Sequence, residues 1–231
     1  MILPTSQSNR FISDSIGHQI KLWRNNIILL LALFVLIFIA PLMGQFGKIV
    51  THSALILVVI SGIFAADYQK QIFKLLFSLG FLTLMSLALS YLFPGSKALN
   101  VISFLLTTIS LIFSTIALIA HVSQAKSVEK STVLCAINSY LLMGLTASIL
   151  FISIDLFIPG SFITLEAGSE NLSNYIYFGF VTLCTVGYGD ITPTAPLARS
   201  LSIFVAVGGQ LYLVIVIALI IGKFLNTQKQ K

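Results

Sequence analysis

The chain has 231 residues, of which 57% are hydrophobic and only 9% are charged. Soluble globular domains carry about 25% charged residues, so this composition excludes a soluble protein and indicates an integral membrane protein. Its net charge of +6 is accounted for by where the basic residues lie along the chain, and no nucleic-acid partner is expected.

The first 25 residues form a segment ahead of the first long apolar run. Ile12, Ile16, Ile20 and Trp23 recur there at helical spacing, with basic residues close by. This pattern predicts an amphipathic helix lying on the membrane surface, with Trp23 as an interfacial anchor. A disordered polar tail is the alternative. No convincing cleavage site ends the first apolar run, so a cleaved signal peptide is not expected.

Six apolar runs then follow, each free of charged residues. A helix needs about 20 apolar residues to cross the hydrocarbon core of a bilayer, within a range of about 17–25. All six runs are predicted to cross, although the second is marginal: 26–43, 49–66, 75–96, 98–125, 131–154 and 200–222. An even number of spans places both termini on the same side of the membrane.

The basic residues decide which side that is. With the N-terminus inside, the inner segments hold ten Lys and Arg residues, whereas the outer ones hold only Lys48, Lys97 and Arg199. Because Lys and Arg concentrate on the cytoplasmic side, both termini of this multi-pass protein are predicted to lie in the cytoplasm, with the spans in the plasma membrane. Four acidic residues then fall on the outer side: Asp155, Glu166, Glu170 and Asp190.

The segment between the fifth and sixth spans has an unusual pattern. Pro159-Gly160 ends the fifth helix, and Ser173 or Asn174 is predicted to cap a short apolar helix over 175–184. At about 1.5 Å per residue this helix is about 15 Å long, so it enters the membrane without crossing. Its C-terminal carbonyl groups would face the middle of the membrane, where the negative end of the helix dipole favours a cation. A re-entrant pore loop is therefore predicted.

The run from Thr185 to Asp190 reads Thr-Val-Gly-Tyr-Gly-Asp and would return toward the outer side. Carbonyl groups of an extended strand alternate sides, whereas a backbone of alternating handedness directs them to one side. Gly187 and Gly189 tolerate the positive φ that such a backbone requires. A row of carbonyl oxygens replaces the hydration shell of an ion. Thr185 adds a hydroxyl at the inner end, and Tyr188 is suited to brace the loop from behind.

From about residue 131 to 225, the order of outer helix, short helix, Thr-Val-Gly-Tyr-Gly run and inner helix resembles the pore domain of the potassium-channel family. With six spans, the chain resembles bacterial voltage-gated-like channels of the tetrameric type. The resemblance implies an all-α membrane protein with six transmembrane helices, a re-entrant pore helix and a selectivity filter. It also implies that four copies of the chain surround one pore, with lipid around them.

The same resemblance assigns roles to individual residues. Potassium would bind the carbonyl oxygens of Thr185, Val186, Gly187 and Tyr188 and the Thr185 hydroxyl, with Gly189 completing the filter. Filter support would come from the pore helix and the outer mouth, at Thr182, Tyr177, Phe178 and Asp190. The permeant ion is the only ligand that the resemblance implies, so no enzymatic activity and no cofactor are expected. The two cysteines, Cys135 and Cys184, are predicted to be reduced core residues, and no Cys/His spacing suggests a metal site.

Two positions depart from the family pattern. Many relatives carry a Trp pair where this chain has Tyr177-Phe178, and Phe178 cannot donate the hydrogen bond that an indole gives near Tyr188 or Asp190. Some relatives also carry an acid at the position of Val181. Neither change touches the carbonyl ring, although both could alter how readily the filter inactivates.

The last span contains Gly208-Gly209, and Gly209 falls where relatives often bend the inner helix. A gating hinge is therefore predicted at Gly208 and Gly209. The alternative is close helix packing through small residues, with Ala206 nearby.

The pattern divides the chain into an N-terminal segment (1–25), a four-helix bundle (26–125) and a pore domain (126–231). The bundle stands where voltage-gated relatives carry their sensor, yet its fourth run, 98–121, has no Lys or Arg. One charge moved through 100 mV is worth about 2.3 kcal/mol, so little voltage dependence is expected without such charges.

The leading hypothesis is a potassium-selective channel. A non-selective cation channel, a potassium-uptake transporter subunit and a silent subunit that needs a partner are the alternatives.

Overall fold

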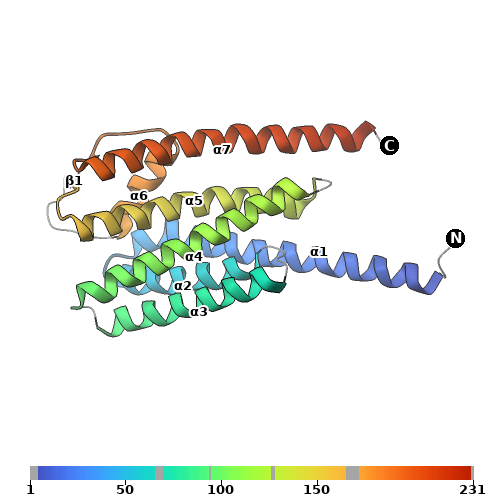
Figure 1. Ribbon diagram of the computed structural model, residues 1–231, viewed down its shortest axis with the longest axis horizontal. Coiled ribbons are helices and arrows are strands. Elements are labelled where there is room, and N and C mark those ends of the chain that lie inside the picture. Colours follow the sequence, from blue (N-terminus) through green and yellow to red (C-terminus); the bar gives the residue numbers. More distant parts are fainter. Residues whose placement is uncertain (1–4, 66–69, 94, 126–127, 165–171, 230–231) are drawn as a thin grey trace.

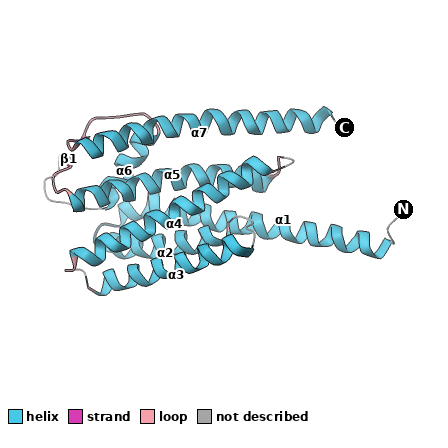
Figure 2. Cartoon of the chain, viewed as in Figure 1, coloured by secondary structure: helices cyan, strands magenta, loops and turns pink. Residues whose placement is uncertain are grey.

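The computed structural model describes residues 5–65, 70–93, 95–125, 128–164 and 172–229. The elements found there follow in this order: α1 (Thr5–Phe34), η1 (Val35–Ile39), η2 (Ala40–Phe46), α2 (Gly47–Phe64), α3 (Lys70–Leu92), α4 (Lys97–Gln124), α5 (Lys130–Phe157), β1 (Phe162–Thr164), α6 (Leu172–Leu183), β2 (Ile191–Pro193) and α7 (Pro196–Lys229). The axes of the long helices run roughly along the longest dimension of the molecule (Figure 1), and helix dominates the chain (Figure 2). The predicted all-α class is confirmed apart from the two short strands.

Five of the described helices are long and apolar enough to cross a membrane: Gln19–Met43, Phe73–Leu92, Lys97–Gln124, Lys130–Phe157 and Pro196–Leu225. They correspond to the first, third, fourth, fifth and sixth predicted spans. The predicted second span is the shorter apolar helix Ile49–Phe64. The start of α1 and the end of α7 lie at the same end of the molecule, opposite β1 (Figure 1).

The N-terminal segment is helical, but it is not the separate helix that the sequence pattern suggests. A single helix, α1, runs without interruption from Thr5 to Phe34 and so crosses the expected boundary between residues 25 and 26. Figure 1 shows its N-terminal half extending beyond the bundle along the direction of the first span. The expectation of a separate helix is therefore corrected, whereas the position of this segment at the membrane surface stays a prediction.

Helix α5 is the centre of the molecule, because it packs against α1, α4, α6 and α7. Leu29, Leu33 and Leu36 recur at helical spacing on α1 and η1, and all three are fully buried. They join Leu142 and Leu145 of α5 in the main apolar core. Helices α1 and α5 therefore share one core.

Small polar residues line the buried face of α4. Ser103, Thr107, Ser110 and Ser114 recur at intervals of three and four residues, and all are buried. The Ser103 hydroxyl donates to the backbone oxygen of Leu99 at 2.8 Å and to that of Ser86 in α3 at 2.7 Å. Small side chains with hydroxyls satisfied by backbone carbonyls let apolar helices approach closely. The polar content of the fourth span thus has a packing role.

A pair of buried asparagines joins the bundle to α5. The Asn138 side-chain amide donates to the backbone oxygen of Asn26 at 2.9 Å and to its Oδ1 at 3.0 Å. Asn26 in turn donates to the backbone oxygen of Ala65, just beyond α2, at 2.5 Å. Both asparagines are completely buried, where each satisfied hydrogen bond is worth about 1 kcal/mol. The network fixes the positions of α1, the end of α2 and α5 relative to one another.

Strands β1 and β2 were not expected from the sequence. They pair antiparallel, with Phe162 opposite Pro193 and Thr164 opposite Ile191. The backbone N–H of Thr194 also donates to the Ser161 oxygen at 2.8 Å. This ladder joins the segment that follows α5 to the segment that follows the Thr-Val-Gly-Tyr-Gly run, so it fixes the Asp190 end of that run.

Candidate ion-conducting site

The short helix α6 leads into the run at Thr185. It spans 12 residues, Leu172–Leu183, which makes it about 18 Å long at 1.5 Å per residue. Ser173 and Asn174 therefore lie in its first turn, and neither is the cap that the sequence suggests. Hydrogen bonds continue past its end: the N–H of Thr185 donates to the Thr182 oxygen at 3.0 Å, and that of Val186 to the Val181 oxygen at 2.9 Å. Thr182 thus supports the run through its backbone.

The backbone of the run alternates in handedness. Thr185 has a φ of 57°, Gly187 a φ of 57° and Gly189 a φ of 82°, whereas Val186 and Tyr188 between them do not have positive φ. This alternation turns successive peptide planes so that their carbonyl groups point to one side. Among the described non-glycine residues only Thr185 has a positive φ, and a β-branched residue rarely adopts one. Such strain, about 1–3 kcal/mol, is typical of functional sites.

A tyrosine of α6 supports the outer end of the run. The Tyr177 hydroxyl donates to Oδ2 of Asp190 at 2.6 Å, and its ring stacks on that of Tyr188 with centroids 6.4 Å apart and planes 3° from parallel. Tyr177 therefore supplies the hydrogen bond that Phe178 cannot give. Phe178 is instead buried against Phe151, with ring centroids 4.8 Å apart.

The contact between Tyr177 and Asp190 sets the charge at the Asp190 end of the run. The hydrogen bond from Tyr177 holds the pKa of Asp190 below its usual range. The same hydrogen bond raises the pKa of Tyr177 to about 12. Near neutral pH the pair is therefore a carboxylate that accepts from a neutral phenol, which keeps one negative charge beside the outer end of the run.

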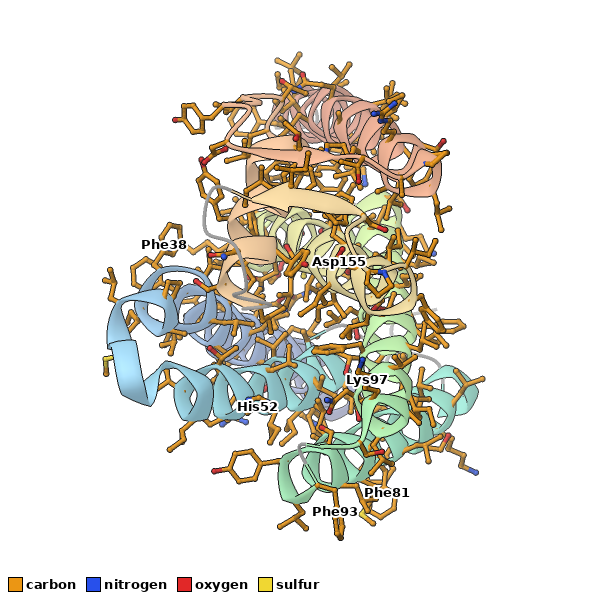
Figure 3. All side chains as sticks on the ribbon, turned by 90° about the vertical axis from the view of Figure 1, so that its left-hand side faces the viewer. Phe38, His52, Phe81, Phe93, Lys97 and Asp155 are labelled. Atoms are coloured by element: carbon orange, nitrogen blue, oxygen red, sulfur yellow. The ribbon has the colours of Figure 1, made fainter. Side chains whose placement is uncertain are left out.

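Asp155 has a structural role that the sequence did not reveal. Figure 3 views the molecule from the strand end and shows Asp155 on α5 there. Its Oδ1 accepts from the backbone N–H of Ser161 at 2.8 Å, and its Oδ2 accepts from the Tyr175 hydroxyl at 2.6 Å. Asp155 thus fixes the turn after α5 to the first half of α6. Of the other outer acids, Glu166 and Glu170 lie outside the described residues.

At the inner end, α7 lies directly against the end of α6. A Cβ atom added to Gly209 would lie 2.4 Å from the backbone oxygen of Leu183, whereas one added to Gly208 would meet nothing within 4 Å. Helix α7 continues through both glycines. Gly209 is therefore required for close packing, which was the alternative to a hinge. The hinge itself stays a prediction, because it concerns a motion.

Two side chains of α7 reach across this contact. The Gln210 amide donates to the Thr185 hydroxyl, with 3.2 Å between Nε2 and Oγ1. The Tyr212 hydroxyl donates to the backbone oxygen of Ala136 in α5 at 2.7 Å and lies 2.9 Å from the Ser139 hydroxyl. Neither contact was predicted from the sequence.

The two cysteines differ in their surroundings. Both are free thiols, and Cys135 is buried as expected. Cys184 is exposed in the single chain, so its assignment as a core residue is corrected. It shares this exposure with Thr185, Val186, Gly187, Tyr188 and Gly189. A single chain therefore leaves this whole run uncovered.

Comparison with known proteins gives the class of this region. Residues 139–226 match the family model described as an ion channel (Ion_trans_2), a range that contains most of α5 and all of α6, the run at Thr185 to Asp190 and nearly all of α7. The chain therefore carries an ion-channel domain, and its apolar helices make it a multi-pass membrane protein.

The relatives include potassium channels. "Two pore potassium channel c" of Oryza sativa subsp. japonica is 46% identical over 52 residues, which are 22% of this chain and 11% of that protein. "Potassium channel K1" of Plasmodium berghei is 47% identical over 34 residues, which are 15% of this chain and 2% of that protein. The similarity thus covers only a small part of either relative. No solved structure matches the chain.

Proposed function

We propose that this chain is the subunit of a potassium-selective channel that conducts passively down the ion's gradient. The alternating backbone at Thr185, Gly187 and Gly189 carries the proposal, because it directs carbonyl oxygens to one side, where they replace the hydration shell of K⁺. In this proposal the carbonyl groups of Thr185, Val186, Gly187 and Tyr188 bind the ion, with Gly189 completing the filter. The permeant ion is the only ligand that the function requires.

A closed filter requires several copies of the chain. Four Thr-Val-Gly-Tyr-Gly loops make one filter in potassium channels, and this sequence contains one such loop. Val186 is 51% exposed and Tyr188 71% exposed in the single chain. Large apolar residues of α7 are exposed as well, among them Ile203 at 66% and Phe204 at 74%. A homotetramer with the four runs around one axis would cover these surfaces.

The proposed orientation has both termini in the cytoplasm and Asp190 at the outer mouth. Ten Lys and Arg residues on the inner side against three on the outer side favour it. The shared position of the two ends of the chain agrees with an even number of crossings (Figure 1). It requires α2 to cross, and its 18 residues span about 27 Å, close to the thickness of the hydrocarbon core.

Flux through liposomes containing the purified protein tests the proposal. With asymmetric K⁺ and Na⁺ the reversal potential should lie near the K⁺ equilibrium value. Gly187→Ala should reduce K⁺ flux, because a Cβ at a φ of 57° adds about 1–3 kcal/mol of strain to a run that already carries it at Thr185, although nothing lies within 4 Å of that Cβ. Gly222→Ala, also with open space around it, is the matched control and should leave flux and selectivity unchanged.

Each alternative predicts a different result in the same experiment. A reversal potential near zero in opposed K⁺ and Na⁺ would identify a non-selective cation channel. A protein that assembles but carries no flux until a second chain is added would be a silent subunit. Either result would contradict the proposal as stated.

A further inference from the structure

We propose that Gln210 is a positioning residue for the innermost cation site of the filter, acting through the Thr185 hydroxyl. This inference rests on the proposed function, because it concerns the same row of oxygens. Its observation is the hydrogen bond of 3.2 Å between Nε2 of Gln210 and Oγ1 of Thr185. The two residues are 25 positions apart and lie on opposite sides of the contact between α6 and α7.

The packing of α7 fixes where the Gln210 amide lies. Gly209, the residue before it, lets α7 approach so closely that any side chain there would overlap the Leu183 oxygen. Leu183 is the last residue of α6 and lies two positions before Thr185. Tyr212, two residues after Gln210 in α7, is anchored to α5 by its hydrogen bond to the backbone oxygen of Ala136. Gln210 therefore lies between two fixed contacts of α7, next to the start of the proposed filter.

Thr185 needs such a partner because of its own geometry. Its positive φ holds the backbone in a conformation that β-branched residues rarely adopt, and its side chain is exposed. A hydroxyl oxygen has one hydrogen to donate and two lone pairs to accept with. An unrestrained hydroxyl would rotate and turn its hydrogen toward a bound cation for part of the time, which would weaken binding.

The Gln210 amide removes this freedom. The amide donates an N–H to Oγ1 and so occupies one lone pair of that oxygen. The hydroxyl hydrogen of Thr185 therefore cannot point toward the Gln210 amide. The remaining lone pair is then available to the cation at the inner end of the filter. Because a glutamine is neutral, the effect comes from orientation and adds no charge to the pore. In an assembly of four chains the contact would recur in each copy.

The cation affinity of this site is measured as the block of K⁺ flux by Ba²⁺ added from the inner side. Ba²⁺ is close to K⁺ in size and carries twice the charge, so it occupies oxygen sites built for K⁺ and stops the flux. Gln210→Leu should raise the half-blocking Ba²⁺ concentration by roughly two- to tenfold, the worth of one hydrogen bond. Gln124→Leu, the same change at the exposed end of α4, should leave it unaltered. Gln210→Met, unbranched and similar in volume, is the second variant should leucine prevent assembly.

A double-mutant cycle separates positioning from a general structural role. Thr185→Val removes the hydroxyl, so adding Gln210→Leu to it should cause no further change in Ba²⁺ block. Thr185→Ser keeps the hydroxyl, and in that background the effect of Gln210→Leu should persist. The same cycle can be measured without recording conduction. The quantity is then the Ba²⁺ concentration needed to raise the unfolding temperature of each purified variant.

The outcomes distinguish this inference from its premise. Wild-type protein without K⁺-selective flux and without Ba²⁺ stabilisation would overturn the proposed function, and the role of Gln210 with it. Normal K⁺ flux combined with unchanged Ba²⁺ block in Gln210→Leu would overturn only the role of Gln210. Equal effects of Gln210→Leu with and without the Thr185 hydroxyl would also overturn it, because Gln210 would then act by another route.

Discussion

The run from Thr185 to Asp190 is held by side-chain contacts at both of its ends. At the outer end Tyr177 bonds to Asp190 and stacks on Tyr188. At the inner end Gln210 bonds to Thr185. These contacts support a backbone in which Thr185 has an unfavourable φ, and strained conformations persist only where their surroundings determine them.

The adjacent glycines of α7 should respond differently to the same substitution. Gly209→Ala places a methyl group 2.4 Å from the Leu183 oxygen, so it should destabilise the protein by about 1–3 kcal/mol through overpacking. Gly208→Ala has open space and should be neutral or stabilise the helix by up to about 1 kcal/mol. Thermal unfolding in detergent measures both. Reduced flux in Gly208→Ala at unchanged stability would favour the hinge, whereas equal stability of the two variants would contradict the packing role.

The pair Tyr177 and Asp190 predicts how the outer mouth depends on pH. Because the pKa of Asp190 is lowered, the contact is present above the ordinary Asp pKa and is lost only as the pH falls through the lowered value. Because the pKa of Tyr177 is raised to about 12, the contact is lost at the alkaline end only as the pH rises toward that value. This pair should therefore leave K⁺ flux constant between about pH 5 and about pH 9.

Tyr177→Phe tests this reading. It removes the hydrogen bond, so the pKa of Asp190 rises toward its usual range and inhibition by external acid should begin at a higher pH than in the wild type. The measurement is K⁺ flux against external pH. The variant Tyr91→Phe, on an exposed tyrosine of α3, serves as control. If the pH at which external acid begins to inhibit K⁺ flux is the same in Tyr177→Phe as in the wild type, Asp190 does not control that inhibition.

At the scale of elements, the inner end of α7 is fixed to the end of α4. The Lys223 ammonium donates to the backbone oxygens of Val122 and Ser123 at 2.7 Å each. A helix leaves its last carbonyl groups unpaired, and a cation there also interacts favourably with the dipole. The C-terminal part of α7 is thus joined to the bundle of its own chain.

Lys223→Met should weaken the contact between α7 and the end of α4. Methionine keeps an unbranched stem but removes the donors, so the free energy of unfolding should fall by about 1 kcal/mol. Thermal unfolding measures the loss, and Lys74→Met, at an exposed site on α3, is the matched control. If α7 must separate from α4 for conduction, the variant should also conduct more. Unchanged stability would show that the bonds to α4 contribute nothing net.

At the scale of the whole molecule, the four-helix bundle packs as one body with α5. Helix α4 ends at Gln124 and α5 begins at Lys130, so the two form an antiparallel pair. The buried face of α4 is formed by Ser and Thr with apolar residues. No Lys or Arg occurs between Lys97 and Lys126, which leaves no basic side chain in the middle of this helix for a membrane potential to move.

Two measurements on the intact protein follow from this arrangement. Native mass spectrometry in detergent should give four copies per particle, and voltage steps on single channels should reveal an effective gating charge below about one unit per channel. A monomeric particle that carries selective flux would contradict the proposed assembly. A gating charge of several units would contradict the prediction that the bundle does not sense voltage.

Much of the fold followed from the sequence, because its causes are local. Apolar length alone predicted the spans, and the run from Thr185 to Asp190 predicted the positive φ of both glycines. The second span was marginal in the sequence and is the short helix in the structure. The strands were missed, because three residues each are too few to show a period.

The sequence by itself determined that this is a membrane protein with a filter-like run, since composition and local backbone preference do not depend on distant residues. Only the tertiary structure decided which side chains hold that run. Gln210 and Thr185 are 25 positions apart, and Lys223 and Val122 are 101 apart. Such contacts arise from how helices pack against one another, and no local pattern encodes them. For the same reason the sequence left a hinge and close packing open at Gly209, and the fold shows the close packing against Leu183.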